Sequence, residues 1–138
     1  MATQSLVPET VRLGNDTKTH LSTLKRRTGI ENWNTLCRWA FCLSLADPAP
    51  VRELAEQGVG AVEMTWRTFT GDEEPIYRAL LVDRCEREHG NLDRDKVAMT
   101  LRQHIARGTA RRVSRRDWKG IGEFLRLVET EGRAVGSS

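Results

Sequence analysis

The sequence lacks the features that mark several large classes of protein. No apolar run approaches the roughly 20 residues that a membrane-spanning helix requires. The N-terminus, MATQSLVPETVRLG, lacks the charged-then-apolar order of a secretory signal. We therefore expect a cytoplasmic protein without membrane contact. Cysteine is scarce, and its count of 3 is odd, which argues against a disulfide framework and fits a reducing compartment.

Motifs for cofactors and nucleotides are missing as well. The sequence has no Cys-X-X-Cys pair. Gly58-Val59-Gly60 and Gly120-Ile121-Gly122 lack the lysine, the hydroxyl residue and the preceding strand of a phosphate-binding loop. We expect no nucleotide site and no cofactor.

What the sequence does contain is typical of one soluble globular domain. Its 138 residues are 38% hydrophobic, and the mean hydropathy is -0.52. No internal repeat is found. We expect a single domain across residues 1–138, with flexible ends over residues 1–9 and 131–138.

Hydrophobic periodicity predicts a compact, mainly α-helical domain with short β segments. Alternation of apolar and polar residues predicts strands at residues 10–13 and 62–66. Asn15 or Asp16 is expected to cap the first helix and Gly29 to end it, while Asn32 or Asn34 is expected to cap the second. Spacing of three and four residues predicts helices at 15–27, 33–46, 74–89, 94–107 and 116–129, with a short one at 51–57. The apolar stripe of the third helix is expected to be Ile76, Leu80, Leu81, Val82 and Cys85.

The second predicted helix is apolar on every side. A helix of that kind must be buried all round, and a chain of this length has difficulty enclosing one by itself. We therefore expect other copies of the chain to cover part of it. The predicted oligomer core consists of Trp33, Leu36, Trp39, Ala40, Phe41 and Leu43.

Positive charge is concentrated in two places although the formal net charge is only +3. One is the end of the first helix, and the other is the segment 93–119, where nine cationic residues stand against three aspartates. Such a local field attracts an acidic partner, of which nucleic acid is the commonest, although arginine stems can also simply coat a helix with hydrated heads. The predicted DNA contacts are Lys18, Lys25, Arg26, Arg27, Arg38, Arg107, Arg111, Arg112, Arg115, Arg116 and Lys119.

The order strand, basic helix, apolar helix is also how ribbon-helix-helix DNA-binding proteins begin. In those proteins two chains pair their first strands and lay the ribbon in the major groove. On that analogy Arg12 would point at base edges. A ribbon-helix-helix transcription regulator is therefore one alternative function, and an arginine-rich scaffold that holds an acidic protein is another.

Residues that could carry catalysis or bind a metal have simpler explanations. Cys37 and Cys42 point about 140° apart around a helix, so they cannot share one tetrahedral metal. Cys85 and His89 could form half of a metal site, but nothing supplies the other half. We predict no catalytic residue and no metal site.

The acidic run and the third histidine lead to the same expectation. The run Asp72-Glu73-Glu74 precedes Pro75 and suits the positive end of a helix dipole better than a magnesium site. His104 lies among apolar residues at helical spacing, which favours a half-buried, hydrogen-bonded histidine over a general base.

Two blocks of the sequence resemble the DndE family of DNA sulfur-modification proteins. The first block is LKRRTGI, residues 24–30, followed by NWN and by LCRWAFCLSLA, residues 36–46. The second block is VEMTW, residues 62–66, continuing through Tyr77 to Cys85, with Arg107-Gly108 beyond it. The resemblance extends over about residues 8–128, and no family motif matches the arginine-rich stretch 109–119.

This resemblance implies a small, mainly helical DNA-binding subunit of the bacterial phosphorothioation machinery, which replaces a non-bridging phosphate oxygen of DNA with sulfur. A cysteine desulfurase, an iron-sulfur protein and an ATPase would perform the chemistry, so the implied role is not enzymatic. One implied partner is double-stranded DNA, intact or nicked. The others are further copies of the chain, in an assembly similar to a tetramer, and the other subunits of this modification system. The system is linked to restriction. Lys25, Arg26 and Arg27 match the family's basic motif.

Overall fold

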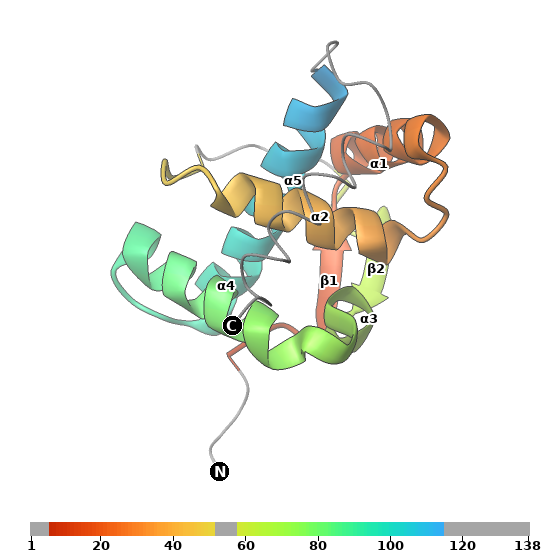
Figure 1. Ribbon diagram of the computed structural model, residues 1–138. Helices are drawn as coiled ribbons and strands as arrows, with labels where there is room; N and C mark the ends of the chain where they lie inside the picture. The colour runs from red at the N-terminus through yellow and green to blue at the C-terminus, as the bar shows by residue number, and fades with distance from the viewer. Residues whose placement is uncertain (1–5, 52–57, 115–138) are drawn as a thin grey trace, which may run out of the picture.

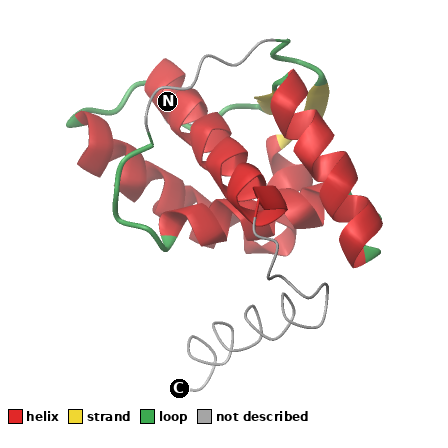
Figure 2. Ribbon diagram, turned by 90° about the horizontal axis from the view of Figure 1, so that it is seen from above, coloured by secondary structure: helices red, strands yellow, loops and turns green. Residues whose placement is uncertain are grey.

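The structure is a computed structural model that describes residues 6–51 and 58–114. Helices dominate it, and the two strands are short (Figures 1 and 2). The prediction of a mainly helical domain is therefore confirmed. The predicted helices at 51–57 and 116–129, and with them Arg115, Arg116 and Lys119, lie outside the described residues. In chain order the elements are β1 (Thr10–Leu13), α1 (Asn15–Thr28), α2 (Trp33–Leu45), β2 (Val62–Thr65), α3 (Trp66–Thr70), the 3-10 turn η1 (Gly71–Glu73), α4 (Glu74–His89) and α5 (Arg94–Ser114).

The two strands pair with each other in one antiparallel sheet. The register places Thr10 opposite Thr65 and Leu13 opposite Val62. The sheet is thus built within one chain, whereas a ribbon-helix-helix protein pairs the first strands of two chains. Arg12 forms an ion pair with Glu63 at 2.9 Å across the two strands.

Strand β2 ends earlier than its alternating pattern predicts. Trp66 was expected to continue the strand but is the first residue of α3. The reason is a local cap: the Thr65 hydroxyl accepts a hydrogen bond from the Thr68 N–H, which turns the chain into a helix. The Trp66 indole is buried under this turn and donates to Glu74 at 2.7 Å.

Helix α5 is the element on which the others pack. It contacts α2, α1, α4 and β1, and α2 crosses it in Figure 1. At this crossing Gly108 lies so close to α2 that an added Cβ would overlap the Ala40 carbonyl. The sequence suggested that α5 ends at Arg107, before this glycine, but the helix continues to Ser114. Gly108 is therefore a packing residue and not a helix end.

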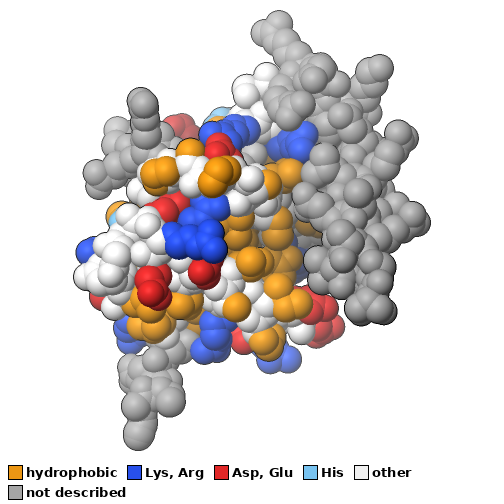
Figure 3. All heavy atoms as spheres, turned by 60° about the vertical axis from the view of Figure 1, so that its left-hand side comes forward, with side chains coloured by type: hydrophobic (Ala, Val, Ile, Leu, Met, Phe, Trp, Pro, Cys, Tyr) orange, Lys and Arg blue, Asp and Glu red, His pale blue; other side chains and the backbone are white. Residues whose placement is uncertain are grey.

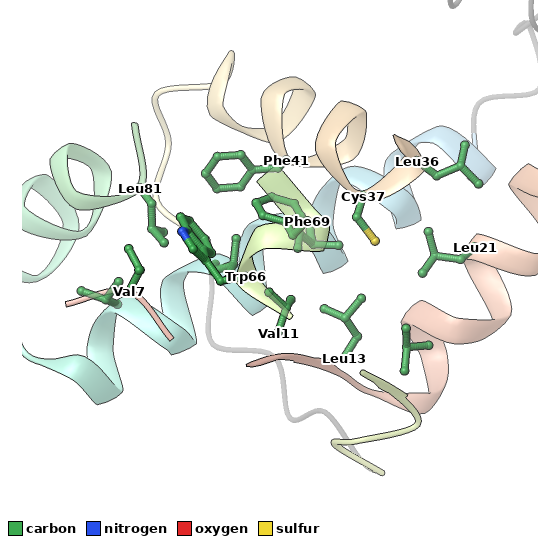
Figure 4. Close-up of a cluster of buried hydrophobic side chains, with 14 of the residues drawn as sticks. Val7, Val11, Leu13, Leu21, Leu36, Cys37, Phe41, Trp66, Phe69 and Leu81 are labelled. Carbon is green, nitrogen blue, oxygen red and sulfur yellow. The ribbon is translucent and has the colours of Figure 1, made fainter. Parts of the chain in front are cut away.

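The core lies between the inner faces of α1, α2, α4 and α5 and the sheet. Phe41, Phe69 and Leu81 are fully buried in it, and Phe41 meets Phe69 edge-to-face at 5.8 Å between ring centroids (Figure 4). Leu36 and Ala40 are each only 2% exposed. These two residues and Phe41 were predicted to be buried between subunits, but their own chain already buries them, so that part of the prediction is wrong.

The predicted limits of the helices agree with the structure better than the predicted capping residues do. Helix α4 has the predicted limits, and Gly29 ends α1 with a φ of 76° that favours glycine. Helix α1 is capped by Gly14 and not by an asparagine or aspartate side chain, and Asn32 precedes α2 without a side-chain hydrogen bond. In α4 the predicted apolar stripe is only partly buried, because Ile76 is 51% and Leu80 39% exposed.

Candidate nucleic-acid interface

Helix α1 turns its cations away from the protein. Its buried face consists of Thr17, Leu21, Leu24 and Thr28, which recur at helical spacing. Its outer face carries Lys18, Lys25, Arg26 and Arg27, all exposed, which we call the α1 basic face. No carboxylate in the described part of the chain pairs with these four residues. Three of them lie in the last turn, where they also stabilise the helix dipole.

Arg27 joins the end of α1 to the end of α5. Its guanidinium donates to the Val113 carbonyl at 3.0 Å. Arg111, another predicted DNA contact, lies two residues earlier on α5 and is half exposed, with an ion pair to Asp47 at 2.7 Å. Arg27 of α1 therefore contacts the last turn of α5, the helix that also carries Arg111. This proximity could not be read from the charge pattern alone.

Three other predicted DNA contacts are directed into the protein. Arg107 and Arg112 are each 8% exposed. The half-buried Arg38 donates to the Phe69 carbonyl at 2.9 Å and to the Thr35 hydroxyl at 3.2 Å. The guanidinium groups of Arg38 and Arg107 hold parts of this chain together, a structural role that the prediction did not foresee, and Arg112 is buried.

Arg107 and Arg84 complete the C-terminal end of α2. Arg107 donates to the Ser44 carbonyl at 2.7 Å and to the Ala49 carbonyl at 2.8 Å, and Arg84 donates to the Leu45 carbonyl at 2.6 Å. The last carbonyls of a helix have no partner within it, and cations are favoured at that end. The two arginines therefore fix the end of α2 against α4 and α5.

Ser44, Glu88 and His104 form a continuous hydrogen-bonded chain beside these arginines. The Ser44 hydroxyl is 2.8 Å from Nδ1 of His104, and Nε2 of His104 is 3.0 Å from the Glu88 carboxylate. We call these three residues with Arg84 and Arg107 the polar junction. Sequence reasoning missed Ser44, Arg84 and Glu88; the only signal was the spacing of four between Arg84 and Glu88, which suits an ion pair within a helix.

The polar junction resembles a hydrolase triad in composition but is sealed from solvent. Ser44 is 1% and His104 0% exposed. The Ser44 hydroxyl also accepts a hydrogen bond from Nε of Arg107 at 2.7 Å, which weakens it as a nucleophile. Burial lowers the pKa of His104 to about 4, so the ring is neutral at pH 7. The protein therefore covers Ser44 and His104 almost completely.

In the described part of the chain, Cys37, Cys85 and Glu74 offer no alternative centre. Burial raises the pKa of the Cys37 thiol to about 12, and burial raises that of Cys85 as well, so neither favours the reactive thiolate. Glu74 is bound by Arg78 and by the Trp66 indole, and these contacts lower the pKa of its carboxyl. Within residues 6–51 and 58–114 no cluster of three or more metal-ligating side chains occurs.

An apolar area remains on the outside of α2 and α4. Trp39, Cys42 and Leu43 of α2 are half-buried, and Ile76 and Leu80 of α4 are exposed. Cys42 lies beside Tyr77 of α4, so the two sets adjoin. Figure 3 shows hydrophobic side chains gathered over the middle of this side of the molecule, with basic side chains next to them. We call these five residues the α2–α4 apolar face; the half-buried Trp33 lies at the start of the same helix.

No described helix is both long and apolar enough to span a bilayer. No curated protein matches the chain. The fold is similar to the crystal structure of DndE from Escherichia coli B7A, described as involved in DNA phosphorothioation modification. The TM-score is 0.65 and the identity 21%, over 78% of this chain and 97% of that chain.

The chain also matches the sequence model of a protein family. The model for DndE, "DNA sulphur modification protein DndE", matches residues 10–119, which include both sequence blocks, the α1 basic face and the polar junction. This range is well over half of the chain. The chain therefore belongs to the DndE family, whose members take part in DNA phosphorothioation.

Proposed function

We propose that this chain is a non-catalytic DNA-binding subunit of a bacterial DNA phosphorothioation system, acting in the cytoplasm as a homo-oligomer together with the other subunits. The observation that carries the proposal is the α1 basic face. Its four cations are exposed, and no carboxylate in the described residues neutralises them. Phosphate contacts of this kind position a protein on DNA without reading its sequence.

The non-catalytic role is supported by the state of the groups that could react. Ser44 and His104 are buried, and Ser44 already accepts a hydrogen bond from Arg107. The raised pKa of Cys37 keeps that thiol protonated, which is unfavourable for carrying sulfur. Sulfur chemistry would then belong to partner subunits, and this chain would hold the DNA.

Assembly into an oligomer, for which we propose a tetramer, is supported by the α2–α4 apolar face. Ile76 and Leu80 stand on an exposed helix surface that a monomer would leave in water. One α1 basic face with four cations binds a duplex weakly at physiological salt. Several copies that engage together raise the overall affinity through effective concentration.

The first prediction concerns DNA affinity and its dependence on salt. In the double variant Lys25→Ala/Arg26→Ala, duplex affinity should fall for all sequences alike, and the slope of log K against log salt should become shallower by about 1 for each phosphate that is no longer neutralised. Titration of a fluorescent duplex at several salt concentrations measures both. For the unchanged protein, neutralisation of about 6–10 phosphates by the assembly would reduce affinity by about 10³–10⁵ between about 50 and 200 mM salt.

The matched control is Arg67→Ala/Arg87→Ala, which removes two exposed cations from α3 and α4. It should leave most of the affinity and the slope in place. Equal losses in both variants would mean that net charge matters and the α1 basic face does not. A response that does not change with salt would remove nucleic acid as the ligand.

A further inference from the structure

Leu43, Ile76 and Leu80 of the α2–α4 apolar face lie on two neighbouring helices and are only partly covered by the described residues. Ile76 is 51% and Leu80 39% exposed, and Leu43 is half-buried. Cys42, next to Leu43 on α2, lies beside Tyr77 of α4, which brings the apolar side chains of the two helices onto one surface. A surface of this kind marks a binding site for an apolar partner, because its contact with water is unfavourable.

The chain leaves the described part of the structure beside this face. Ser114 is the last residue of α5, and it lines a pocket of about 260 Å³ together with Leu43. Each further residue extends the chain by at most about 3.6 Å, so Trp118 can lie at most about 15 Å from Ser114. The sequence that follows α5 is therefore within reach of the α2–α4 apolar face.

Residues 118–128, which we call the C-terminal segment, carry the pattern of an amphipathic helix. A helix of this length is about 16 Å long, and apolar positions recur on one side of it at intervals of three and four residues. The apolar stripe consists of Trp118, Ile121, Phe124, Leu125 and Val128. A stripe of this kind fits an apolar groove between two helices.

We propose that the C-terminal segment docks as a helix on the α2–α4 apolar face of its own chain and there competes with a second copy of the chain. This competition presupposes the assembly proposed above. Only residues 115–117 connect the segment to α5, which gives it an effective concentration of about millimolar at the face. The copies then bind one another only through the fraction of chains whose face is uncovered, so the segment weakens assembly.

Charged residues of opposite sign border the two surfaces. Asp72 and Glu73 are exposed just before α4, four and three residues ahead of Ile76. Lys119 and Arg126 are seven residues apart, so a helix carries both on one side, next to the apolar stripe. Attraction between these groups favours one orientation of the segment on the face, with its cationic side towards the start of α4.

Two features make this cover reversible and particular to this chain. Gly120 and Gly122 lower the helix propensity of the C-terminal segment, so its docked helix is weak enough for a second copy to displace. The family model ends at residue 119 and therefore excludes most of the segment. The competition is thus an addition to the fold that the family model describes.

The first test cross-links the C-terminal segment to Cys42 in the dilute full-length chain. Cys37 and Cys85 are buried, whereas Cys42 is half-buried, so a thiol reagent reaches Cys42 first. In Leu125→Cys, a short bifunctional maleimide should join the new thiol to Cys42 of the same chain. In the matched control Glu123→Cys, the thiol lies on the opposite side of the helix, and the yield should be about tenfold lower. Mass spectrometry of the digested protein identifies the product.

Assembly provides the second test. Phe124→Asp/Leu125→Asp places two charges in the apolar stripe, which should release the segment from the face. The dissociation constant of the assembly should then fall about tenfold or more, as measured by sedimentation on dilution. The matched control Thr130→Asp/Gly132→Asp adds the same charge beyond the stripe and should leave the constant unchanged. Neither variant alters a residue of the described core.

Three results would overturn the proposal. One is an equal yield, or no product, in Leu125→Cys and Glu123→Cys. Another is a product that joins two chains even at high dilution, which would assign the segment to a second copy. The last is an assembly that Phe124→Asp/Leu125→Asp weakens or leaves unchanged. A failure of the proposed assembly is distinguishable, since a chain that is monomeric at every concentration can still give the Leu125→Cys product, and neither test contains DNA.

Discussion

Arg107 and Arg111 lie one helical turn apart on α5 but differ in what they contact. Arg107 is almost fully buried and donates to the Ser44 hydroxyl and to three carbonyls, whereas the Arg111 side chain is 52% exposed and pairs with Asp47. A buried donor that is removed leaves its acceptors unpaired in a medium of low dielectric constant. An exposed ion pair is weakened by water and salt.

The two arginines should therefore differ strongly in their effect on stability. Arg107→Met should lower the free energy of unfolding by about 2–4 kcal/mol, because buried carbonyls and the Ser44 hydroxyl lose their donor. Arg111→Ala should lower it by less than about 1 kcal/mol. Urea unfolding measures both. A similar, small loss in the two variants would show that Arg107 does not fix the end of α2.

At the residue scale, the sequence does not distinguish the buried, structural Arg107 from the exposed Arg111. Both arginines belong to one cationic run, and charge counting assigns them the same function. What separates them is the passage of the α2 C-terminus beside α5, a contact between residues about 60 positions apart. Lys25 and Arg26 are different, because the spacing of Leu21 and Leu24 already assigns them to the outer face of a helix.

At the scale of elements, local signals were sufficient where no tertiary contact overrides them. The limits of α4 follow from the acidic start, Pro75 in the first turn and Gly90 at the end. The end of α5 was misplaced because Gly108 is also a common helix terminator. Only the neighbouring backbone of Ala40 reveals that this glycine is required for helix packing.

The close crossing of α2 and α5 predicts that Gly108→Ala changes the stability in the opposite direction to the usual effect of alanine in a helix. Alanine usually stabilises a helix interior by up to about 1 kcal/mol relative to glycine. Gly108→Ala should instead destabilise the protein by about 1–3 kcal/mol, because the new methyl group overlaps the Ala40 carbonyl and forces the helices apart. Thermal unfolding measures the change. A stabilised variant would mean that the helices cross at a greater distance.

The polar junction joins α2, α4 and α5 through a histidine that must stay neutral. Ser44, Glu88, Arg84 and Arg107 face the His104 ring, and burial lowers the pKa of His104 from 6.5 to about 4. In the unfolded chain the ring binds a proton below pH 6.5, while in the folded chain it does so only near pH 4. Folded protein should therefore lose stability as the pH falls through this window and not above it.

The loss assigned to His104 is about 3 kcal/mol between neutral pH and pH 4. Urea unfolding at a series of pH values measures it. His104→Gln retains hydrogen-bonding capacity but cannot titrate, so its stability should change much less over the same window. If the variant and the unchanged protein have parallel pH profiles, other groups are responsible for the loss.

At the scale of the whole molecule, we predicted that this chain could not enclose the apolar helix α2 by itself. That premise is only partly right. The chain encloses Leu36, Ala40 and Phe41 by itself, because α5 and α3 cover that side of α2. The sequence could not reveal this, since it does not tell how closely helices approach. Among the described helices, the exposed large hydrophobic residues are Ile76 and Leu80 of α4, where helical spacing predicted burial.

The α2–α4 apolar face gives the last prediction, on assembly. Light scattering of the purified protein at micromolar concentration should give a multiple of 15.7 kDa. Leu80→Asp places a charge in the proposed interface without disturbing the core, because Leu80 is already 39% exposed. This variant should stay folded, dissociate into monomers and bind duplex DNA about 10²–10⁴ times more weakly, although no basic residue has changed.

Asn91→Asp, which adds the same charge at an exposed loop position, is the matched control and should retain both the assembly and the affinity. A monomeric unchanged protein with high DNA affinity would contradict multivalent binding. A Leu80→Asp variant that stays assembled would place the interface on another surface. The basic residues that meet the DNA are identical in the unchanged protein, in Leu80→Asp and in Asn91→Asp. If Leu80→Asp alone both dissociates and loses affinity, the affinity must depend on the repetition of the α1 basic face in an assembly.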